Sequence, residues 1–386
     1  AGALTAHQAH LADVVARQSG EYAAPQGPVE RAIAALFAEM FGLERVSAKA
    51  NFFDLGGTSL ETVRLAQRLA ERFGGPALPL ATILQNPTVR ALADKASAHQ
   101  RDSADYDPVV PLQRLGTKTP LFCIHPASGE VLVFLALAQY FANERPVFAL
   151  RARGFNPGES PFDTFDELVG TYIEALLRHQ PHGPYALMGY SYGAAVAFEM
   201  TRRLELRGER VAFLGSLDGT IHIGNRRDRF DTIQSAVTLA FFLSLLTHDQ
   251  LLKLPAQLRA APHLDPCAVI LEQASCERIA ELDLDPPRFA AWVALSHALV
   301  QAGETYIPSG QVCSVTVFHA EPLDGLQHEW LQALGRWNEF TRSPNRYIKV
   351  PGEHHTLLGP KHVASLHALV RAELERALDS PSQNSQ

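Results

Sequence analysis

The amino-acid sequence predicts two domains, a small all-α bundle of helices followed by a larger α/β domain. Residues 29–41, 59–73 and 88–98 carry apolar side chains at helical spacing. Beyond residue 107, short apolar runs alternate with helical patterns, as is typical of an α/β domain. At 386 residues and 46% hydrophobic, the chain can bury a core in each domain.

Composition excludes several classes of function. A net charge of −7 without a basic block argues against a nucleic-acid partner. The longest apolar stretch, residues 236–246, is too short to cross a bilayer, and no signal peptide is apparent, so no membrane partner is expected. The four cysteines have neither C-x-x-C nor zinc spacing, which favours a reduced, cytoplasmic chain without a metal site (Cys123, Cys267, Cys276, Cys313).

The first domain contains Asp-Leu-Gly-Gly-Thr-Ser-Leu at residues 54–60. Thr58 and Glu61 have the spacing of a capping box, so a helix is expected to start at Ser59 and run to about residue 73. A phosphate on Ser59 would lie among the unpaired N–H groups at the positive end of that helix. The alternative is that Ser59 only starts a helix.

This motif resembles the attachment site of peptidyl carrier (thiolation) domains. The resemblance implies that residues 25–98 form such a carrier and that Ser59 holds a covalent 4′-phosphopantetheine arm. It also implies a phosphopantetheinyl transferase as a partner. Residues 1–24 are expected to form a linker. Residues 99–107 are polar and without periodicity, and a linker there would let the carrier swing its arm toward the second domain.

The second domain contains Gly-Tyr-Ser-Tyr-Gly at residues 189–193, after an apolar run (184–188) and before a helical pattern (194–206). A serine between two glycines at a strand-to-helix turn is the nucleophile elbow of α/β-hydrolases. The glycines permit a strained turn in which side chains at their positions would clash, and the turn lifts the hydroxyl of Ser191 clear of the sheet. The alternative is a tight packing turn that happens to hold a serine.

A serine nucleophile needs a base and an orienting carboxylate, and in this fold they follow in the order Ser, Asp or Glu, His. The buried-strand pattern at residues 211–217 leads directly into Asp218, which is the preferred carboxylate. A further strand is expected at about residues 312–319. Glu321 and Asp324 follow it and are the reserve candidates.

The candidate base lies near the end of the chain. Residues 347–350 are expected to form the last strand, and the loop at residues 351–356 precedes a helix that begins near Lys361. His354 and His355 both stand in this loop, where a base is needed. A metal site is disfavoured because the sequence has no H-E-x-x-H motif and no third ligand at helical spacing.

Residues 351–358, Pro-Gly-Glu-His-His-Thr-Leu-Leu, resemble the G-x-H-x-x-(M/L)-L segment of the thioesterase domains that end nonribosomal peptide and polyketide synthases. In that pattern the first histidine is the base, which implies that His354 takes the role. Residues 120–129 resemble the first strand and oxyanion loop of the same family, and Asp218 matches its strand-end aspartate. The resemblance therefore implies a thioesterase with Ser191, Asp218 and His354 as catalytic triad.

Attack on a thioester creates a negative oxygen that backbone N–H groups must receive. One donor is expected to be the amide of Tyr192, and the resemblance puts the second at Ala127. His125 either braces this loop or is an ordinary loop histidine. The resemblance covers residues 109–378, within an α/β-hydrolase domain expected at residues 108–380 and followed by a disordered tail, residues 381–386.

Residues 224–307 form a long insertion with several helical apolar patterns, which the sheet of an α/β-hydrolase does not need. The resemblance implies a helical lid over the acyl channel. Phe241 and Phe242 in this segment are candidates to line the channel, and core packing between lid and sheet is an equal alternative.

Residues 130–134, 149–155 and 183–192 resemble a particular group, the thioesterases of short adenylation–thiolation–thioesterase synthetases. These join two aryl-pyruvate units into quinones or furanones by Claisen-type carbon–carbon bond formation. The resemblance implies an upstream adenylation domain of the same synthetase and terminal product release, and a start at Ala1 without methionine suits an excised piece of a longer synthetase. The alternatives are hydrolytic or macrocyclising release of a peptide or polyketide, an editing thioesterase, and a non-catalytic binding module.

Overall fold

The computed structural model describes residues 22–73, 78, 80–99, 106–154, 159–221, 231–282, 284–322 and 327–379. The chain divides into two compact units, Ala1–Tyr106 with Glu281–Asp283, and Asp107–Ala280 with Leu284–Gln386. Most of the segments expected to be linkers or tail, namely residues 1–21, 100–105 and 381–386, lie outside the described residues.

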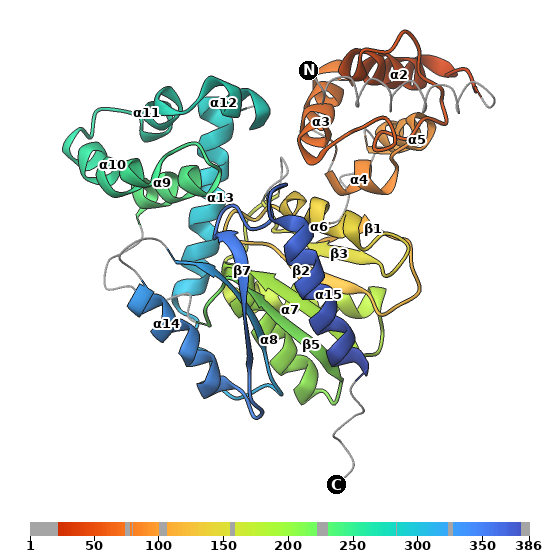
Figure 1. The fold of residues 1–386 in the computed structure, drawn as a ribbon. Coiled ribbons are helices and arrows are strands. Elements are labelled where there is room, and N and C mark those ends of the chain that lie inside the picture. Colours follow the sequence, from red (N-terminus) through yellow and green to blue (C-terminus); the bar gives the residue numbers. More distant parts are fainter. Residues whose placement is uncertain are drawn as a thin grey trace. The chain divides into compact units, whose positions relative to one another are not determined.

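The described part of the first unit is a helical bundle, in which α2 packs against α3 and α5, and α4 contacts both α3 and α5 (Figure 1). The bounds are α2 (Gly27–Phe41), α3 (Ser59–Phe73), α4 (Leu80–Gln85) and α5 (Val89–His99). Its core is built from apolar side chains of these helices and of the loop that holds Phe52. Helix α4 was not predicted, because six residues are too few to display helical periodicity.

Two features hold the loop before Ser59, a capping box at the start of α3 and the close contact of Gly57 with Phe52. The backbone N–H of Thr58 donates to the Glu61 carboxylate (2.8 Å), and the N–H of Glu61 donates to the Thr58 hydroxyl (3.4 Å), so the expected capping box forms. A Cβ at Gly57 would lie 2.4 Å from the ring of Phe52, so only glycine fits there. Helix α3 therefore begins at Ser59 and ends at Phe73, as expected.

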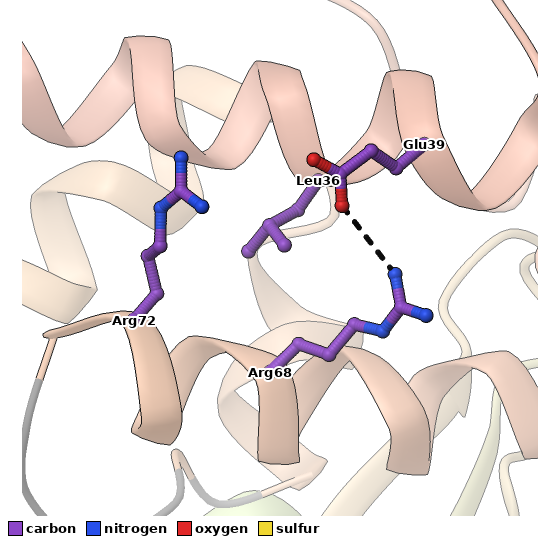
Figure 2. Close-up of a pocket in the computed structure, with 4 residues that line it drawn as sticks. All are labelled: Leu36, Glu39, Arg68 and Arg72. Carbon is purple, nitrogen blue, oxygen red and sulfur yellow. Dashed lines mark ion pairs between the residues drawn. The ribbon is translucent and has the colours of Figure 1, made fainter.

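A shallow groove separates α2 from α3 in this unit (Figure 2). Leu36 and Glu39 line it from α2, and Arg68 and Arg72 line it from α3. One ion pair joins Arg68 to Glu39 across the groove at 3.6 Å, and its side chains are 46% and 58% exposed, so solvent screens it and it contributes little stability. The groove contains none of the residues that the sequence predicts to be functional.

The second unit is built on a seven-stranded sheet of order β1-β3-β2-β4-β5-β6-β7. Only the edge strand β1 runs antiparallel to its neighbour, and the other pairings are parallel. The strands are β1 (Val109–Gln113), β2 (Leu121–Ile124), β3 (Val147–Leu150), β4 (Tyr185–Tyr190), β5 (Val211–Leu217), β6 (Thr316–Glu321) and β7 (Arg346–Glu353). Every residue of β4 is buried, as expected for a central parallel strand covered on both faces.

The chain forms helices between the strands of this sheet and after the last strand (Figure 1). They are the short η1 (Leu132–Phe134), α6 (Leu135–Tyr140), α7 (Phe165–His179), α8 (Tyr192–Leu206), α14 (Gln327–Gly335), η2 (Arg336–Phe340) and α15 (Val363–Asp379). α8 lies along β4 and β5, which places its first turn directly after the central strand.

Two predicted strand boundaries are wrong. β6 begins at Thr316 rather than near Val312, because Val312 pairs in an isolated bridge with Thr341 instead of joining the ladder with β5. β7 continues to Glu353, although a loop was expected from Pro351. β7 is an edge strand, and proline is tolerated there because its missing N–H breaks no ladder bond on the open side.

Between β5 and β6 the chain forms a group of helices, which we call the lid: α9 (Thr232–Phe242), α10 (His248–Ala260), α11 (Pro266–Gln273), α12 (Cys276–Leu282) and α13 (Pro286–Glu304). Residues 266–282 form two helices, α11 and α12, because the Ser275 hydroxyl accepts a bond from the N–H of Arg278 and starts a new helix. The long helix α13 contacts α9 and α11 of the lid and also α7, which lies outside the lid beside the sheet (Figure 1).

Among the described residues, none of the helices has the length and apolar character needed to cross a membrane.

Candidate active site

Ser191 lies at a strained turn between β4 and α8, with φ 54° and ψ −119°. The positive φ belongs to the serine itself, and side chains at the flanking glycines would clash with backbone, as expected. A Cβ at Gly189 would lie 1.9 Å from the carbonyl oxygen of Gly193, and a Cβ at Gly193 would lie 2.5 Å from the carbonyl oxygens of Ile124 and His125. The two glycines are thus required by close backbone approach.

We expect Gly189→Ala to destabilise this unit by at least about 3 kcal/mol, because its Cβ meets backbone that no side-chain rotation can move aside. Urea unfolding followed by tryptophan fluorescence measures this unit alone, since all three tryptophans lie beyond residue 107. The control is Gly170→Ala in α7, where an added Cβ meets nothing within 4 Å and about 0.5–1 kcal/mol of stabilisation is expected. Equal midpoints for the two variants would contradict the packing of the elbow.

Asp218 follows β5 and is bound on both carboxylate oxygens. Oδ2 lies 2.7 Å from Nδ1 of His354, and Oδ1 accepts the backbone N–H of Ala320 at 2.7 Å. The Asp218 side chain is 3% exposed, so its charge is held away from solvent. An Nδ1–H that donates to Asp218 leaves Nε2 of His354 as the basic nitrogen, which is the tautomer that a general base requires.

The reserve carboxylates do not take this place. Glu321 forms an ion pair with Lys349, and its side chain is 58% exposed. Asp324 lies outside the described residues. Among the described carboxylates of this region, the one bonded to His354 is therefore Asp218.

Ser191, Asp218 and His354 follow β4, β5 and β7, and these parallel strands present their carboxyl ends at one edge of the sheet. The backbone N–H of Ser191 donates to the carbonyl of Leu217 at 2.9 Å, which brings the serine beside the residue that precedes Asp218. A Cβ at Gly219 would lie 2.5 Å from the carbonyl oxygen of Ser191, so the two strand ends are in direct contact.

His354, the candidate base, also contacts residues that sequence reasoning missed or left open. The ring of His354 lies 5.2 Å from that of Tyr190 and 4.9 Å from that of Phe242, and the Tyr190 hydroxyl donates to the His354 carbonyl. Phe242 is 39% exposed at this point, whereas Phe241 is buried and belongs to the core. No signal in the sequence distinguishes the two phenylalanines, because burial of a lid residue depends on what the lid covers.

His355 points to a different neighbour from His354. Its ring packs 4.8 Å from that of Phe241, and burial lowers its pKa. It therefore stands beside His354, the candidate base, with its ring against the lid.

Ala127 and Tyr192 flank the same edge of the sheet. Ala127 lies in a turn after β2, closed by a bond from the N–H of Gly129 to the carbonyl of Pro126 at 2.9 Å. Tyr192 is the first residue of α8, so its N–H has no carbonyl one turn earlier in the helix to bind. Both amides occupy the positions from which an oxyanion hole is built in this fold.

His125 braces this turn, and the interpretation as an ordinary loop histidine is wrong. Burial lowers the pKa of His125 to about 4, so the ring is neutral. Its Nδ1–H donates to the carbonyl of Pro126 at 2.7 Å, and its Nε2 lies 2.7 Å from the hydroxyl oxygen of Tyr172, which also lies 2.9 Å from the Arg151 carbonyl.

In the part of the chain that the structure describes, no cluster of three His, Cys, Asp or Glu residues could hold a metal ion. The four cysteines are unpaired. Cys123 and Cys267 are buried, and Cys276 and Cys313 are exposed.

Comparison with known families defines the class of protein. Residues 119–372 match the thioesterase domain family, and residues 31–95 match the phosphopantetheine attachment site family. The chain therefore belongs to the thioesterase domain family, and its first unit is a carrier domain with covalently attached 4′-phosphopantetheine. Ser59 suits the attachment, because it is the first residue of a capped helix whose N-terminal N–H groups favour a phosphate. This combination is that of a thioesterase acting on a carrier-bound thioester.

More particularly, the chain is 41% identical to the atromentin synthetase of Tapinella panuoides and 40% identical to an atromentin synthetase of Paxillus involutus. Each match covers 97% of this chain and 40% of the relative, so the chain spans less than half the length of these proteins. A further relative from Paxillus involutus, 39% identical over 90% of the chain and 37% of its own length, is described as an inactive atromentin synthetase.

Two solved structures share the fold. A four-domain holo nonribosomal peptide synthetase bound to AMP and glycine matches 94% of this chain and 27% of its own, with TM-score 0.58 and 23% identity. A thioesterase domain bound with a dodecadepsipeptide matches 71% of this chain and 100% of its own, with TM-score 0.53 and 21% identity.

Proposed function

We propose that this chain performs terminal product release in a nonribosomal peptide synthetase-like enzyme. An acyl group delivered on an arm at Ser59 is transferred to Ser191 and then released from it. The observation that carries the proposal is the 2.7 Å bond from His354 to the buried Asp218, at the sheet edge where the strained Ser191 ends β4. Upstream, an adenylation domain of the same synthetase activates the acyl substrate, and a phosphopantetheinyl transferase installs the arm.

The first half-reaction is acyl transfer. The arm, when bound, supplies a thioester, whose weak C–S bond makes its carbonyl a good electrophile. The hydroxyl of Ser191 attacks this carbonyl while Nε2 of His354 takes its proton and Asp218 stabilises the resulting imidazolium. The amides of Ala127 and Tyr192 receive the oxyanion. His354 then returns the proton to the departing thiolate, which leaves an acyl ester on Ser191.

The second half-reaction decides the product. The resemblance of residues 130–134, 149–155 and 183–192 to synthetases that join two aryl-pyruvate units favours condensation, and the similarity to atromentin synthetases is compatible with it. In this reaction His354 removes a proton from the carbon next to the carbonyl of one unit. That carbon attacks the Ser191 ester, a C–C bond forms, the C–O bond breaks, and the serine oxygen takes the proton back. Hydrolysis or macrocyclisation of a peptide or polyketide would use the same residues with water or an internal nucleophile in place of the carbanion.

Product analysis separates these outcomes. The full chain is loaded with an aryl-pyruvyl group from the corresponding coenzyme A thioester by a phosphopantetheinyl transferase, and the released compounds are identified by mass spectrometry. We expect a product with a new carbon–carbon bond between two units. Free monomeric acid as the sole product would contradict condensation and favour hydrolytic release. Faster removal of an acetyl group than of the aryl-pyruvyl group would instead indicate an editing enzyme.

A further inference from the structure

A hydrogen bond ties the lid to the turn that holds Ala127. The indole Nε1–H of Trp292, on the long lid helix α13, donates to the carbonyl of Ser128 at 2.8 Å. These two residues are 164 positions apart in the sequence. α13 also contacts α9, the helix that carries Phe242 against His354, so the lid meets both the base and the oxyanion turn.

Three carbonyls near Ala127, those of Pro126, Ser128 and Gly129, each accept a hydrogen bond. The Pro126 carbonyl accepts from Nδ1–H of His125, and the Gly129 carbonyl accepts from the N–H of Ala152 at 3.0 Å. Both of these donors belong to the loops at the edge of the sheet. The Ser128 carbonyl, by contrast, is held by Trp292 from the lid. A carbonyl fixes its whole peptide plane, so these bonds together determine where the neighbouring N–H groups point.

Helix α13 also packs directly on this turn. Gly129 has φ 77°, and a Cβ there would lie 3.1 Å from Leu295 and 3.3 Å from Leu299 of α13. A Cβ at Gly154, in the loop after β3, would lie 3.1 Å from Leu295 as well. Leu295 and Leu299 are buried, so α13 packs against the turn through buried side chains that lie near the Trp292 hydrogen bond.

We propose that Trp292 is a positioning residue for the reaction at Ser191. Its N–H holds the Ser128 carbonyl, whose peptide plane carries the N–H of Gly129. That N–H donates to the Pro126 carbonyl, whose peptide plane carries the Ala127 amide, so Trp292 keeps this amide aimed at the developing oxyanion. Acyl transfer then depends on the packing of α13 against the turn that holds Ala127. The lid therefore affects catalysis as well as substrate access. This inference rests on the proposed function, because it needs Ala127 to be an oxyanion donor.

The test removes the N–H and keeps an aromatic ring. Trp292→Phe in the full chain is expected to lower kcat about tenfold, less than the loss of a whole oxyanion donor, with KM little changed. The same loss is expected for an acetyl and an arylacetyl pantetheine thioester, because a positioning defect does not depend on acyl size. The matched control is Trp330→Phe, since the indole N–H of Trp330 is buried and has no partner among the described residues. Its kcat is expected to be unchanged.

A second readout distinguishes positioning from a general structural role. A boronic acid that forms a tetrahedral adduct with Ser191 should bind Trp292→Phe more weakly by the same factor as the loss in kcat/KM. Unchanged kcat, or a rise in KM confined to the larger acyl group, would overturn the inference, since the latter result would make Trp292 a contact of the acyl chain. If a fluorophosphonate fails to label Ser191 in the wild type, the proposed function itself falls. Normal labelling with an unaffected Trp292→Phe refutes only the positioning role.

Discussion

Ser191→Ala is expected to retain an acyl group on the carrier that the wild type releases. Without the hydroxyl no acyl-enzyme forms, and turnover should fall by at least about 10³-fold, leaving only what the oxyanion hole and binding can supply. Intact-protein mass spectrometry, after a phosphopantetheinyl transferase loads an acyl arm, follows the acyl group directly. One relative is described as inactive, so sequence similarity cannot replace this measurement.

Ser59→Ala is the companion variant, because it should never gain the mass of the arm. Together the two variants separate attachment from catalysis in one experiment. If wild type and Ser191→Ala keep the acyl group equally long, the carrier assignment stands. The role proposed for Ser191 would then be contradicted for that acyl group.

The second large effect is expected for Asp218→Asn, with a decrease in kcat of about 10³–10⁴-fold and little change in fold. An amide at this position can donate to Nδ1 of His354, which stabilises the tautomer whose Nε2 carries the proton and cannot act as a base. The asparagine also cannot balance the imidazolium. Steady-state hydrolysis of a pantetheine thioester measures kcat, and circular dichroism verifies the fold.

Glu321→Gln is the matched control for this carboxylate. Glu321 follows the same sheet edge but pairs with Lys349 at an exposed position, so its loss is expected to leave kcat unchanged. A large decrease for Glu321→Gln together with a mild effect of Asp218→Asn would reverse the assignment of the acid.

Much of the fold follows from local patterns. The strand at residues 211–217 and the helix at residues 59–73 have the bounds that the sequence predicts, because apolar periodicity and a capping box both act within a few residues. Predictions at the edge of the sheet were less accurate. β7 continues through Pro351 to Glu353, since an open edge tolerates a proline that a central strand would not.

The candidate site likewise has parts that local motifs predict and parts that only the tertiary structure reveals. The sequence by itself predicted Ser59 as the attachment serine, the elbow at Ser191 and a histidine after the last strand, because each belongs to a short motif with its own local geometry. Only the tertiary structure decided that His354 bonds Asp218 rather than Glu321, and that Phe242 rather than Phe241 stands exposed beside it. It alone showed Trp292 holding Ser128. Such contacts join residues far apart in the chain, and packing of whole elements, not any local pattern, brings them within bonding distance.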